Sequence, residues 1–530
     1  MFLDILIISV VTIAAWYKTH THIHHLQQIS YKNKNYIKWR FGNYTKIIRP
    51  HEVLFIGGVF LTQLTDTLWS RLIGLLLILI DVYFFHLIRT AYAAKKKLKY
   101  TPRVKRLLVT NAIQLIGLMT LTFFMVTWAS VILILALYLF GFITVIASNL
   151  INKPMELTIN NWYYNDAHKT LAKVPNLTII GITGSYGKTS TKNVLNAMLS
   201  KDFNVLMTPE SFNTKMGLTR AIREHMKPTH EIFIAEMGAD HVGDIKELME
   251  FVQPSLGIIT SIGPQHLDTF KTFENIVNEK GNMFRLLKTG GTAFVNVTDS
   301  NIVGLPRRSD LNYVSFSAQP DGNIETPDFN IESISVNSKG SSFTLVHKPS
   351  GKKVRLTTQL LGRHNLANIV AGAAVAINLG IPMDRLPYLT MDLKPVDHRL
   401  SIRRVNDHYT VLDDAFNSNP VGSRMALEVL DQFEGNQKII ITPGMIGLGD
   451  RHYELNKAFG VNISKTCDFT ILVGKHQTRP IQDGLEEGGY NPAKLYVAKS
   501  TQDAFSKLSE IVKQDDVVLL ENDLPDTFNE

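Results

Sequence analysis

Cysteine is nearly absent from this chain, because Cys467 is the only one among 530 residues. A single thiol cannot form an intramolecular disulfide, and it excludes a zinc site built on several cysteines. A chain without disulfides is typical of a reducing compartment. Internal repeats and low-complexity segments are also missing, which excludes solenoid and other repeat architectures.

Acidic residues are scarce in the first third of the chain. Residues 1–157 contain seventeen Lys and Arg against five Asp and Glu, a net charge of +12, whereas the whole chain has +8. The remaining residues therefore have a net charge of −4. Because the positive charge belongs to one part of the chain, the high isoelectric point does not indicate nucleic-acid binding.

Apolar runs fill the same third, at residues 2–16, 53–66, 72–89, 107–128 and 130–150. A helix that crosses a bilayer needs about 17–25 residues, so the last two runs are long enough and the first two are short. We therefore predict a transmembrane domain of four or five helices over residues 1–152. A cleaved signal peptide is disfavoured, because Asp4 replaces a basic start.

The polar segments between these runs are basic. Residues 17–51 and 93–106 each hold seven Lys and Arg and no acid, and such segments stay on the cytoplasmic side. With five spans, the N-terminus lies outside and everything after residue 152 lies inside. Both basic segments then lie inside as well, so the predicted topology is self-consistent.

From about residue 177 short strands alternate with helices, which predicts parallel βαβ units. The expected strands are residues 177–182, 232–237, 256–259 and 292–296. Residues 311–360 indicate antiparallel strands instead, with a hairpin around 348–353. An alanine-rich helix is expected over 365–379, and the pattern breaks at Pro395.

A second alternation follows, which predicts a small doubly wound, Rossmann-like domain. The expected strands are residues 409–412, 438–442, 468–473, 495–497 and 516–521, and the expected helices are 422–433, 452–463 and 501–512. We predict a multi-domain chain: the transmembrane helices, a linker over 153–176, an α/β P-loop ATPase domain with a parallel sheet over 177–396, and the smaller α/β domain over 397–530.

The most informative motif follows the strand 177–182 and opens a helix over 191–199. Its residues are Thr183, Gly184, Ser185, Tyr186, Gly187, Lys188, Thr189 and Ser190. Glycines let backbone N–H groups surround a phosphate, a lysine reaches the β- and γ-phosphates, and a threonine hydroxyl can hold Mg²⁺. Ile182 stands where the strict P-loop spacing has a glycine, so the shorter T-G-x-x-G-K-T form is the one that is met. This predicts an ATP site; an ordinary glycine-rich turn is the alternative.

Three further groups lie at predicted strand ends. Glu236 ends the second apolar strand, where a carboxylate can face a metal–phosphate site. His266 follows the next strand, although such a histidine alone is more often an ordinary loop residue. Asp413 and Asp414 open the last domain at a strand end where ligands gather in such sheets, or form a capping and turn cluster.

Two features of the apolar third remain open. Asp81 lies inside the third apolar run, where it contacts a substrate or partner or else serves helix packing. The histidines His20, His22, His24 and His25 could bind a metal, but a polar segment beside the membrane is the favoured interpretation.

Taken in order, the motifs resemble those of the Mur ligases. The segments that carry the resemblance are 183–192, Ser211–Leu218, Glu236–Ala239, Ile262–Leu267, Lys280–Gly281, Leu361–Asn368 and Asp413–Pro420. The branch that adds D-alanyl-D-alanine to a UDP-muramoyl tripeptide is the most similar one, over about residues 177–475. The resemblance implies an ATP-dependent carboxylate–amine ligase that works through an acyl phosphate.

The resemblance also implies roles for single residues. Lys188 and Thr189 match the residues that hold the phosphates and Mg²⁺, while Glu236 and His266 match metal-site residues. Lys280 matches a lysine that is carbamylated in several relatives and then acts as a metal ligand. The nucleotide-side and hinge positions are matched by Asn365, Asn368, Arg399 and Asp414.

The chain departs from the family in its first third and at three later points. Apolar helices stand where the family has a soluble domain that binds the UDP-sugar, which puts a UDP-linked substrate in doubt. Asn282 replaces a glutamate after Lys280–Gly281, and Gly447 replaces another in the segment 445–449. The acids near the C-terminus, Glu521 to Asp526, replace a basic segment, and either recognise an amine or form a solvated tail.

These observations favour a membrane-bound ligase that uses ATP and Mg²⁺ on the cytoplasmic face of a bacterial cell membrane. Its expected partners are a small amine and a carboxylate-bearing precursor of peptidoglycan or another envelope polymer. This precursor is either lipid-linked or free, and nucleic acid is not expected as a partner. Two alternatives stay open: a synthase of an amide-linked exopolymer such as poly-γ-glutamate, and a membrane protein whose ligase fold has a regulatory, non-catalytic role.

Overall fold

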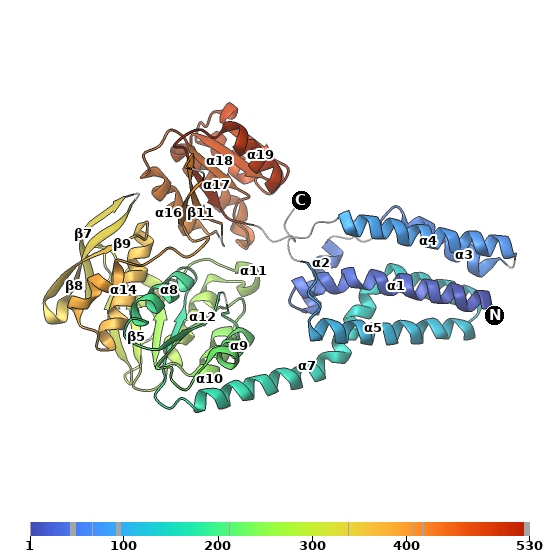
Figure 1. The fold of residues 1–530 in the computed structure, drawn as a ribbon, viewed down its shortest axis with the longest axis horizontal. Helices are drawn as coiled ribbons and strands as arrows, with labels where there is room; N and C mark the ends of the chain where they lie inside the picture. The colour runs from blue at the N-terminus through green and yellow to red at the C-terminus, as the bar shows by residue number, and fades with distance from the viewer. Residues whose placement is uncertain are drawn as a thin grey trace. The chain divides into compact units, whose positions relative to one another are not determined.

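The computed structural model describes residues 2–42, 49–65, 67–91, 97–210, 212–337, 339–405, 407–415 and 418–523. The chain divides into two compact units, Met1–Trp162 and Tyr163–Glu530. Among the described residues, the first unit contains helices only, and the second contains two sheets with helices on their faces (Figure 1). The prediction of apolar helices followed by α/β domains is therefore confirmed.

The helices of the N-terminal unit are α1 (Phe2–Gln28), α2 (Asn33–Gly42), α3 (Glu52–Leu64), α4 (Leu68–Ala91), α5 (Pro102–Leu121), α6 (Thr127–Leu139) and α7 (Gly141–Ala172). In the part of the chain that is described, three stretches are long and apolar enough to cross a membrane: Leu3–Gln28, Leu68–Ile88 and Pro102–Phe124. A fourth arises if α6 and α7, which meet at a bend of 74°, form one broken span.

Helix α3 is short for a membrane span, since 13 residues extend about 20 Å against an apolar thickness of about 30 Å. It packs closely on α4 through two glycines. A Cβ atom on Gly58 would stand 2.6 Å from the carbonyl oxygen of Gly74, and one on Gly74 would stand 2.7 Å from that of Gly58. Small residues allow such close helix packing in membranes. The second predicted span is therefore a short helix in a glycine-packed pair.

The segment predicted as a linker is mostly helical. Residues 153–172 continue α7, a helix of 32 residues that contains Pro154.

The middle domain contains a nine-stranded sheet in the order β2-β3-β1-β4-β5-β6-β7-β8-β9. Its strands are β1 (Thr178–Thr183), β2 (Val205–Met207), β3 (Ile232–Glu236), β4 (Leu256–Ile259), β5 (Thr292–Asn296), β6 (Asn312–Phe316), β7 (Phe329–Asn337), β8 (Gly340–His347) and β9 (Lys352–Thr358). Strand β1 lies between β3 and β4, parallel to both. The carboxyl ends of these three strands therefore lie side by side.

The section 311–360 is only partly antiparallel. Strand β8 is antiparallel to both β7 and β9, and the hairpin at Lys348–Gly351 is present. Strand β6, however, runs parallel to β5 and extends the parallel sheet. Alternating polarity revealed a half-exposed strand but not its direction, since both directions share that pattern.

Helices cover both faces of this sheet: α8 (Lys188–Leu199), α9 (Lys215–His225), α10 (Asp244–Val252), α11 (Leu267–Phe270), α12 (Phe273–Arg285), α13 (Ser300–Val303), α14 (Arg363–Asn378) and α15 (Leu386–Thr390). On one face α8 and α14 share a core with Ile180 and Ile234, and the alanines of α14 allow the two helices to approach closely. On the other face Ala235 and Ile259 pack against α10 and α12. The apolar positions of β1, β3 and β4 are buried on both sides, as parallel strands require.

The C-terminal domain has a six-stranded sheet in the order β10-β11-β15-β12-β13-β14. Its strands are β10 (Ser401–Val405), β11 (Tyr409–Asp414), β12 (Lys438–Thr442), β13 (Phe469–Val473), β14 (Leu495–Ala498) and β15 (Val517–Glu521), and its helices are α16 (Pro420–Asp431), α17 (His452–Thr466), α18 (Arg479–Glu487) and α19 (Thr501–Ile511). All neighbours are parallel except β10. The predicted doubly wound domain is confirmed, with β10 and α18 added.

Candidate active site

The glycine-containing loop connects the end of β1 to the first turn of α8. Gly187 precedes the helix with a φ of 81°, and Gly184 has a φ of 148°. A Cβ atom on Gly184 would stand 2.0 Å from Oγ1 of Thr260. Only glycine therefore fits at this position, and the N-terminus of α8 is left for an anion, as the motif predicted.

The loop is fixed by the segment that follows β4. The hydroxyl of Ser185 donates to the carbonyl of Gly263 at 2.8 Å, and the hydroxyl of Tyr186 donates to that of Pro264 at 2.8 Å. The backbone N–H of Tyr186 donates to Oγ of Ser261 at 3.1 Å. These bonds give the loop its shape without using the N–H groups at the start of α8.

Lys188 begins α8 and lies against its own loop. Its Nζ donates to the carbonyl of Gly184 at 2.8 Å and to that of Ser185 at 3.4 Å. Burial lowers the pKa of Lys188, Glu236 raises it and Arg399 lowers it again. The ammonium group is therefore already at the loop where phosphate oxygens would gather.

Glu236, at the end of β3, is the central carboxylate of the site. Oε1 accepts from Oγ1 of Thr189 at 3.1 Å and from Nδ2 of Asn213 at 3.4 Å. Nζ of Lys192 lies 3.0 Å from Oε2, and both side chains are 1% exposed. The ammonium of Lys192 also donates to the carbonyl of Glu210. Among the described residues, Oε2 has no hydrogen-bond donor.

The oxygens around Glu236 fit Mg²⁺. The hydroxyl of Thr189 and Oε2 of Glu236 are hard oxygen ligands, and Mg²⁺ is commonly held by one or two such groups together with water and substrate phosphates. The ammonium of Lys192 already supplies a positive charge to Oε2, as a buried carboxylate requires, and Mg²⁺ would add to it. The described residues contain no cluster of three or more His, Cys, Asp or Glu that could enclose a metal, so phosphate oxygens would complete the coordination.

His266 and Lys280 lie on the same side as Lys188. Nε2 of His266 lies 3.3 Å from Oδ1 of Asp240. Burial lowers the pKa of His266, Asp240 raises it, and Lys188 and Lys280 lower it again. The charges of the predicted metal-site residues therefore act on one another, and Asp240 is a member that the sequence reasoning missed.

Lys280 lies inside α12 and is 2% exposed. Burial lowers its pKa to about 7, and the charge of Lys188 contributes to this shift. A large share of the Lys280 amines is thus neutral near pH 7, and a neutral amine is the form that reacts with carbon dioxide. This environment suits the carbamylation that the resemblance implied.

The two predicted asparagines of α14 reach the loop from the opposite side. Nδ2 of Asn368 donates to Oδ1 of Asn365 at 3.1 Å, and Oδ1 of Asn368 accepts from Oγ1 of Thr191 at 2.9 Å. A Cβ atom on Gly187 would stand 3.2 Å from Oδ1 of Asn368. The asparagines are therefore packed against the start of α8; the side chain of His364 lies outside the described residues.

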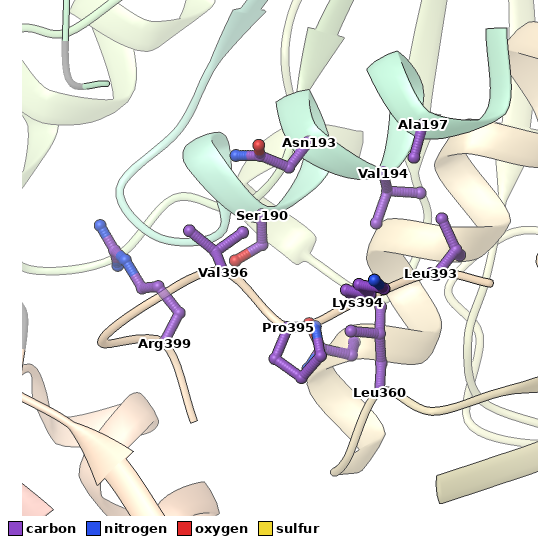
Figure 2. Close-up of a pocket in the computed structure, with 11 residues that line it drawn as sticks. Ser190, Asn193, Val194, Ala197, Leu360, Leu393, Lys394, Pro395, Val396 and Arg399 are labelled. Carbon is purple, nitrogen blue, oxygen red and sulfur yellow. The ribbon is translucent and has the colours of Figure 1, made fainter. Parts of the chain in front are cut away.

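A pocket lies beside this contact (Figure 2). Ser190 and Asn193 of α8 face the segment Leu393–Val396, and Arg399 stands at the far end of the pocket. Asn365 also lines it. One residue from each predicted group, Ser190 of the phosphate loop, Asn365 and Arg399, thus lines one space.

The charges of Arg399 and Asp414 act on each other. Burial lowers the pKa of Arg399, while Asp414 and Glu236 raise it. Oδ1 of Asp414 accepts from the backbone N–H of Leu400 at 3.1 Å. Asp414 ends β11 and is paired in register with Glu521 at the end of β15.

Asp414, which is half-buried, and Glu521, which is fully buried, form an acid pair. Burial raises the pKa of both carboxyl groups. Asp414 raises the pKa of Glu521 further, whereas a hydrogen bond with Glu521 lowers the pKa of Asp414. The hydroxyl of Ser418 donates to Oε1 of Glu521 at 2.5 Å. Glu521 is 0% exposed, so this acid belongs to the sheet rather than to a solvated tail. Asp526 and Asn417 lie outside the described residues.

The departures from the family pattern have local roles. Nδ2 of Asn282 donates to Oε2 of Glu279 at 3.3 Å, and its Oδ1 accepts from Nη1 of Arg285 at 2.7 Å. Gly447 has a φ of 73°, a conformation that glycine adopts readily.

In the N-terminal unit Asp81 is fully buried and hydrogen-bonded. It accepts from OH of Tyr138 at 2.5 Å, and its Oδ1 lies 2.6 Å from Nδ1 of His51. These contacts favour a packing role for Asp81. The four histidines lie on α1, and among the described residues they do not form a metal-binding group.

Two family models match the chain. The Mur ligase middle domain matches residues 182–376, and the Mur ligase glutamate ligase domain matches residues 398–521. Both ranges lie in the second unit, and together they cover more than half of the chain. They correspond to the two α/β domains described above.

Individual relatives agree with these matches. The UDP-N-acetylmuramoyl-tripeptide–D-alanyl-D-alanine ligase of Buchnera aphidicola is 29% identical over 303 residues, which are 57% of this chain and 64% of that protein. The Escherichia coli enzyme of the same name is 29% identical, over 51% of this chain and 58% of that protein. The chain thus spans less than two thirds of the length of these relatives.

Solved structures show the same fold. A MurF structure from Acinetobacter baumannii has a TM-score of 0.59 at 24% identity, covering 68% of this chain and 76% of the other. The MurF ligase of Thermotoga maritima in complex with ADP has a TM-score of 0.60 at 24% identity, covering 68% and 80%. With its two matched domains in family order, the chain belongs to the Mur ligase family.

Proposed function

We propose that this protein is an ATP-dependent ligase that joins a carboxylate to an amine on a precursor of peptidoglycan or another envelope polymer. The single observation that carries the proposal is the arrangement around Glu236. A glycine loop, a lysine, a threonine and a buried carboxylate stand together at the ends of β1 and β3. This arrangement of groups suits the transfer of a phosphoryl group between anions.

In the proposed reaction the substrate carboxylate attacks the γ-phosphorus of ATP, and the bond from that phosphorus to the β-γ bridging oxygen breaks. The resulting acyl phosphate is attacked by the amine, which then loses a proton, and the C–O bond to phosphate breaks to leave an amide. The protein has to neutralise charge during both steps. Lys188 serves the γ-phosphate, and Arg399 serves the same group from the hinge.

Mg²⁺ would supply the remaining positive charge when bound. Thr189 and Glu236 are the residues that would hold it, with His266 and a carbamylated Lys280 on the second side of the site. The low pKa of Lys280, about 7, supports this role, because a protonated lysine can neither be carbamylated nor bind a cation. Asn365, Asn368 and Asp414 are assigned to the nucleotide.

The ligase is proposed to work at the cytoplasmic face of a bacterial membrane. Three apolar helices of spanning length and one bent pair precede the ligase domains, and the basic segments indicate which side is inside. The relatives are named for adding D-alanyl-D-alanine to a UDP-muramoyl tripeptide. We place the carboxylate substrate in the same chemical class, an envelope precursor with a peptide carboxylate. For a membrane-bound ligase, we propose that this precursor is lipid-linked.

A chromosomal Lys188→Ala substitution tests this proposal in cells. We expect envelope precursors or polymers to lose one amide-linked group, seen as a mass difference between the two strains. A ladder of masses built from one amino acid would instead indicate an exopolymer synthase. Unchanged glycopeptides and polymers in the variant would contradict the ligase proposal.

A further inference from the structure

Buried polar atoms without partners are concentrated in the N-terminal unit. Among the described residues, fifteen buried side-chain nitrogen and oxygen atoms have no hydrogen-bond partner, and twelve of them belong to residues 22–152. Such atoms are costly to bury unless a ligand or water satisfies them. Two of the other three belong to Glu236 and Glu521, in the site already described.

Helix α1 has a polar face toward the interior. Lys18, His22 and His25 are spaced by four and three residues, which places them on one side of a helix. Lys18 is paired, with its Nζ 2.5 Å from Oε1 of Glu52. His22 is 2% exposed, and neither of its ring nitrogens has a partner among the described residues.

Arg40, on the neighbouring helix α2, is 4% exposed, and its Nε and Nη2 atoms have no partner among the described residues. Burial lowers the pKa of the Arg40 guanidinium, Tyr36 and Glu52 raise it, and Arg49 lowers it again. Arg49 therefore lies near enough for its charge to act on Arg40. Nη1 of Arg49 and OH of Tyr36 also lack partners in the described part of the chain.

Arg40 and His22 meet at the break between α6 and α7. The guanidinium of Arg40 lies 5.3 Å from the centre of the Phe142 ring, and the His22 ring lies 6.4 Å from the same ring. A Cβ atom on Gly141, the first residue of α7, would stand 3.7 Å from the His22 ring. The N-terminus of a helix adds partial positive charge and free N–H groups. Arg40 and His22 thus converge there from two other helices.

The charges at this place favour an anion. Donors come from Arg40, Arg49 and His22. Oε1 of the nearby Glu52 is paired with Lys18, and its Oε2 has no hydrogen-bond partner among the described residues, so this one carboxylate faces three cations: Lys18, Arg40 and Arg49. The other buried carboxylate, Asp81, is bound by His51 and Tyr138. The Arg40 guanidinium and the His22 ring come from two helices, and the Arg49 guanidinium comes from the segment before α3. Such donors match an anion with several oxygens, and arginine binds phosphate groups with paired bonds.

We propose that α1, α2 and the start of α7 form a binding site for a phosphate or diphosphate group, with Arg40 as its main ligand. The group belongs either to a lipid head group or to a free phosphate compound. Non-helical backbone and buried cations within an apolar helical unit are typical of a site that receives a polar ligand. The site does not depend on the ligase activity, so it can fail while the proposed function stands.

The test uses the full-length protein, purified in dodecyl maltoside without added lipid or ATP. Its thermal unfolding is followed by intrinsic fluorescence during titration with farnesyl diphosphate, farnesol or inorganic pyrophosphate. We expect a saturable rise in unfolding temperature of about 3–5 °C with farnesyl diphosphate and none with farnesol. An equal rise with pyrophosphate would also support the anion site and would assign it to a free phosphate compound.

Variants on α2 assign the effect to Arg40. Arg40→Gln is expected to abolish the rise, whereas Lys38→Gln, which removes an exposed positive charge from the same helix, is expected to keep it. If Arg40→Gln does not fold, Arg40→Lys replaces it in the test. The comparison of farnesyl diphosphate with farnesol on the wild-type protein then also decides whether the proposal stands. No rise with either phosphate compound, or the same rise in a folded Arg40→Gln, would overturn the proposal.

Discussion

At the scale of single residues, the proposed ATP and Mg²⁺ site depends on Glu236, whose two carboxylate oxygens have different partners. One oxygen is bonded to Thr189 and Asn213, and the other faces Lys192 without a hydrogen bond. A carboxylate held in this way is oriented but not saturated. It can therefore exchange an ammonium contact for a metal ion without rearranging the end of β3.

Glu236→Gln is predicted to reduce substrate-dependent phosphate release about 10²- to 10³-fold, the loss typical of removing one charge-stabilising group. An amide has the same volume but no charge for Mg²⁺, and it leaves the buried Lys192 without a counter-charge. The measurement is phosphate release as a function of Mg²⁺ concentration. Glu247→Gln, at a carboxylate whose side chain is 54% exposed, is the control and should behave as wild type; a fully active Glu236→Gln would remove Glu236 from the metal site.

Asp414→Asn is predicted to stabilise the protein at neutral pH. Burial raises the pKa of Asp414 to about 6, above the ordinary value of about 3.9. Between these two pH values the folded state binds more protons than the unfolded state, so the stability of the protein falls as pH rises from about 3.9 to about 6. Above about pH 6 the full cost of ionising Asp414 in the folded protein remains. The cost is on the order of 2–3 kcal/mol, which asparagine avoids.

The measurement is the unfolding temperature of both proteins at pH 4.5 and pH 8. We expect the variant to unfold at a higher temperature at pH 8 and the difference to shrink at the lower pH, with Asp384→Asn, an exposed aspartate, showing neither effect. A difference that is the same at both pH values would contradict the buried-charge explanation.

The sequence identified some site residues and missed others for a physical reason. Lys188 and Thr189 follow from the glycine spacing, since that local pattern alone fixes a loop at a helix start. Lys192 and Asp240 were not found. Their roles come from contacts with residues more than 20 positions away, and a single sequence shows each of them only as an ordinary surface charge.

At the scale of elements, the loop between β1 and α8 is shaped by close backbone approach. Gly184→Ala is predicted to abolish nucleotide binding, because the new Cβ atom would stand 2.0 Å from Oγ1 of Thr260. The measurement is binding of a fluorescent ATP analogue, with thermal unfolding as the check on folding. Gly351→Ala is the matched control, since Gly351 also has a positive φ, 68°, but has nothing within 4 Å of the added atom.

In that comparison, wild-type affinity in Gly184→Ala would show that the loop does not approach the segment after β4. Loss of binding in both variants would attribute the effect to general backbone strain. The expected result is loss in Gly184→Ala alone.

Strand positions were predicted more accurately than strand directions and connections. Residues 256–259, 292–296 and 438–442 form strands with the expected bounds, because buried parallel strands are short apolar runs with clear ends. The direction of β6 depends on pairing with β5, and the helical state of residues 153–172 depends on the helix that precedes them. Neither is encoded in local periodicity.

At the scale of the whole molecule, the apolar helices and the ligase domains are two compact units. The proposed topology places both basic segments of the first unit in the cytoplasm. This topology can be tested with introduced cysteines, because Cys467 is the only native one. Cys467 is buried, and burial raises the pKa of its thiol, so it should not react with a maleimide.

Single cysteines introduced as Lys38→Cys and Lys97→Cys, both at exposed positions, are therefore predicted to react with a membrane-impermeant maleimide only after the cells are opened. Wild-type protein is the unlabelled control. Labelling of either position in intact cells would show that a basic segment lies outside and that the number of spans is not five.

The most direct test of the central claim is phosphate release by the full-length protein in nanodiscs. Mg-ATP is supplied with a panel of amino acids, dipeptides and UDP- or lipid-linked wall precursors, and a Lys188→Ala protein is assayed in parallel. The account predicts release that requires both a carboxylate and an amine, that is matched by one amide product per phosphate, and that is lost in the variant. Release that is independent of both substrates, or that persists unchanged in Lys188→Ala, would contradict it.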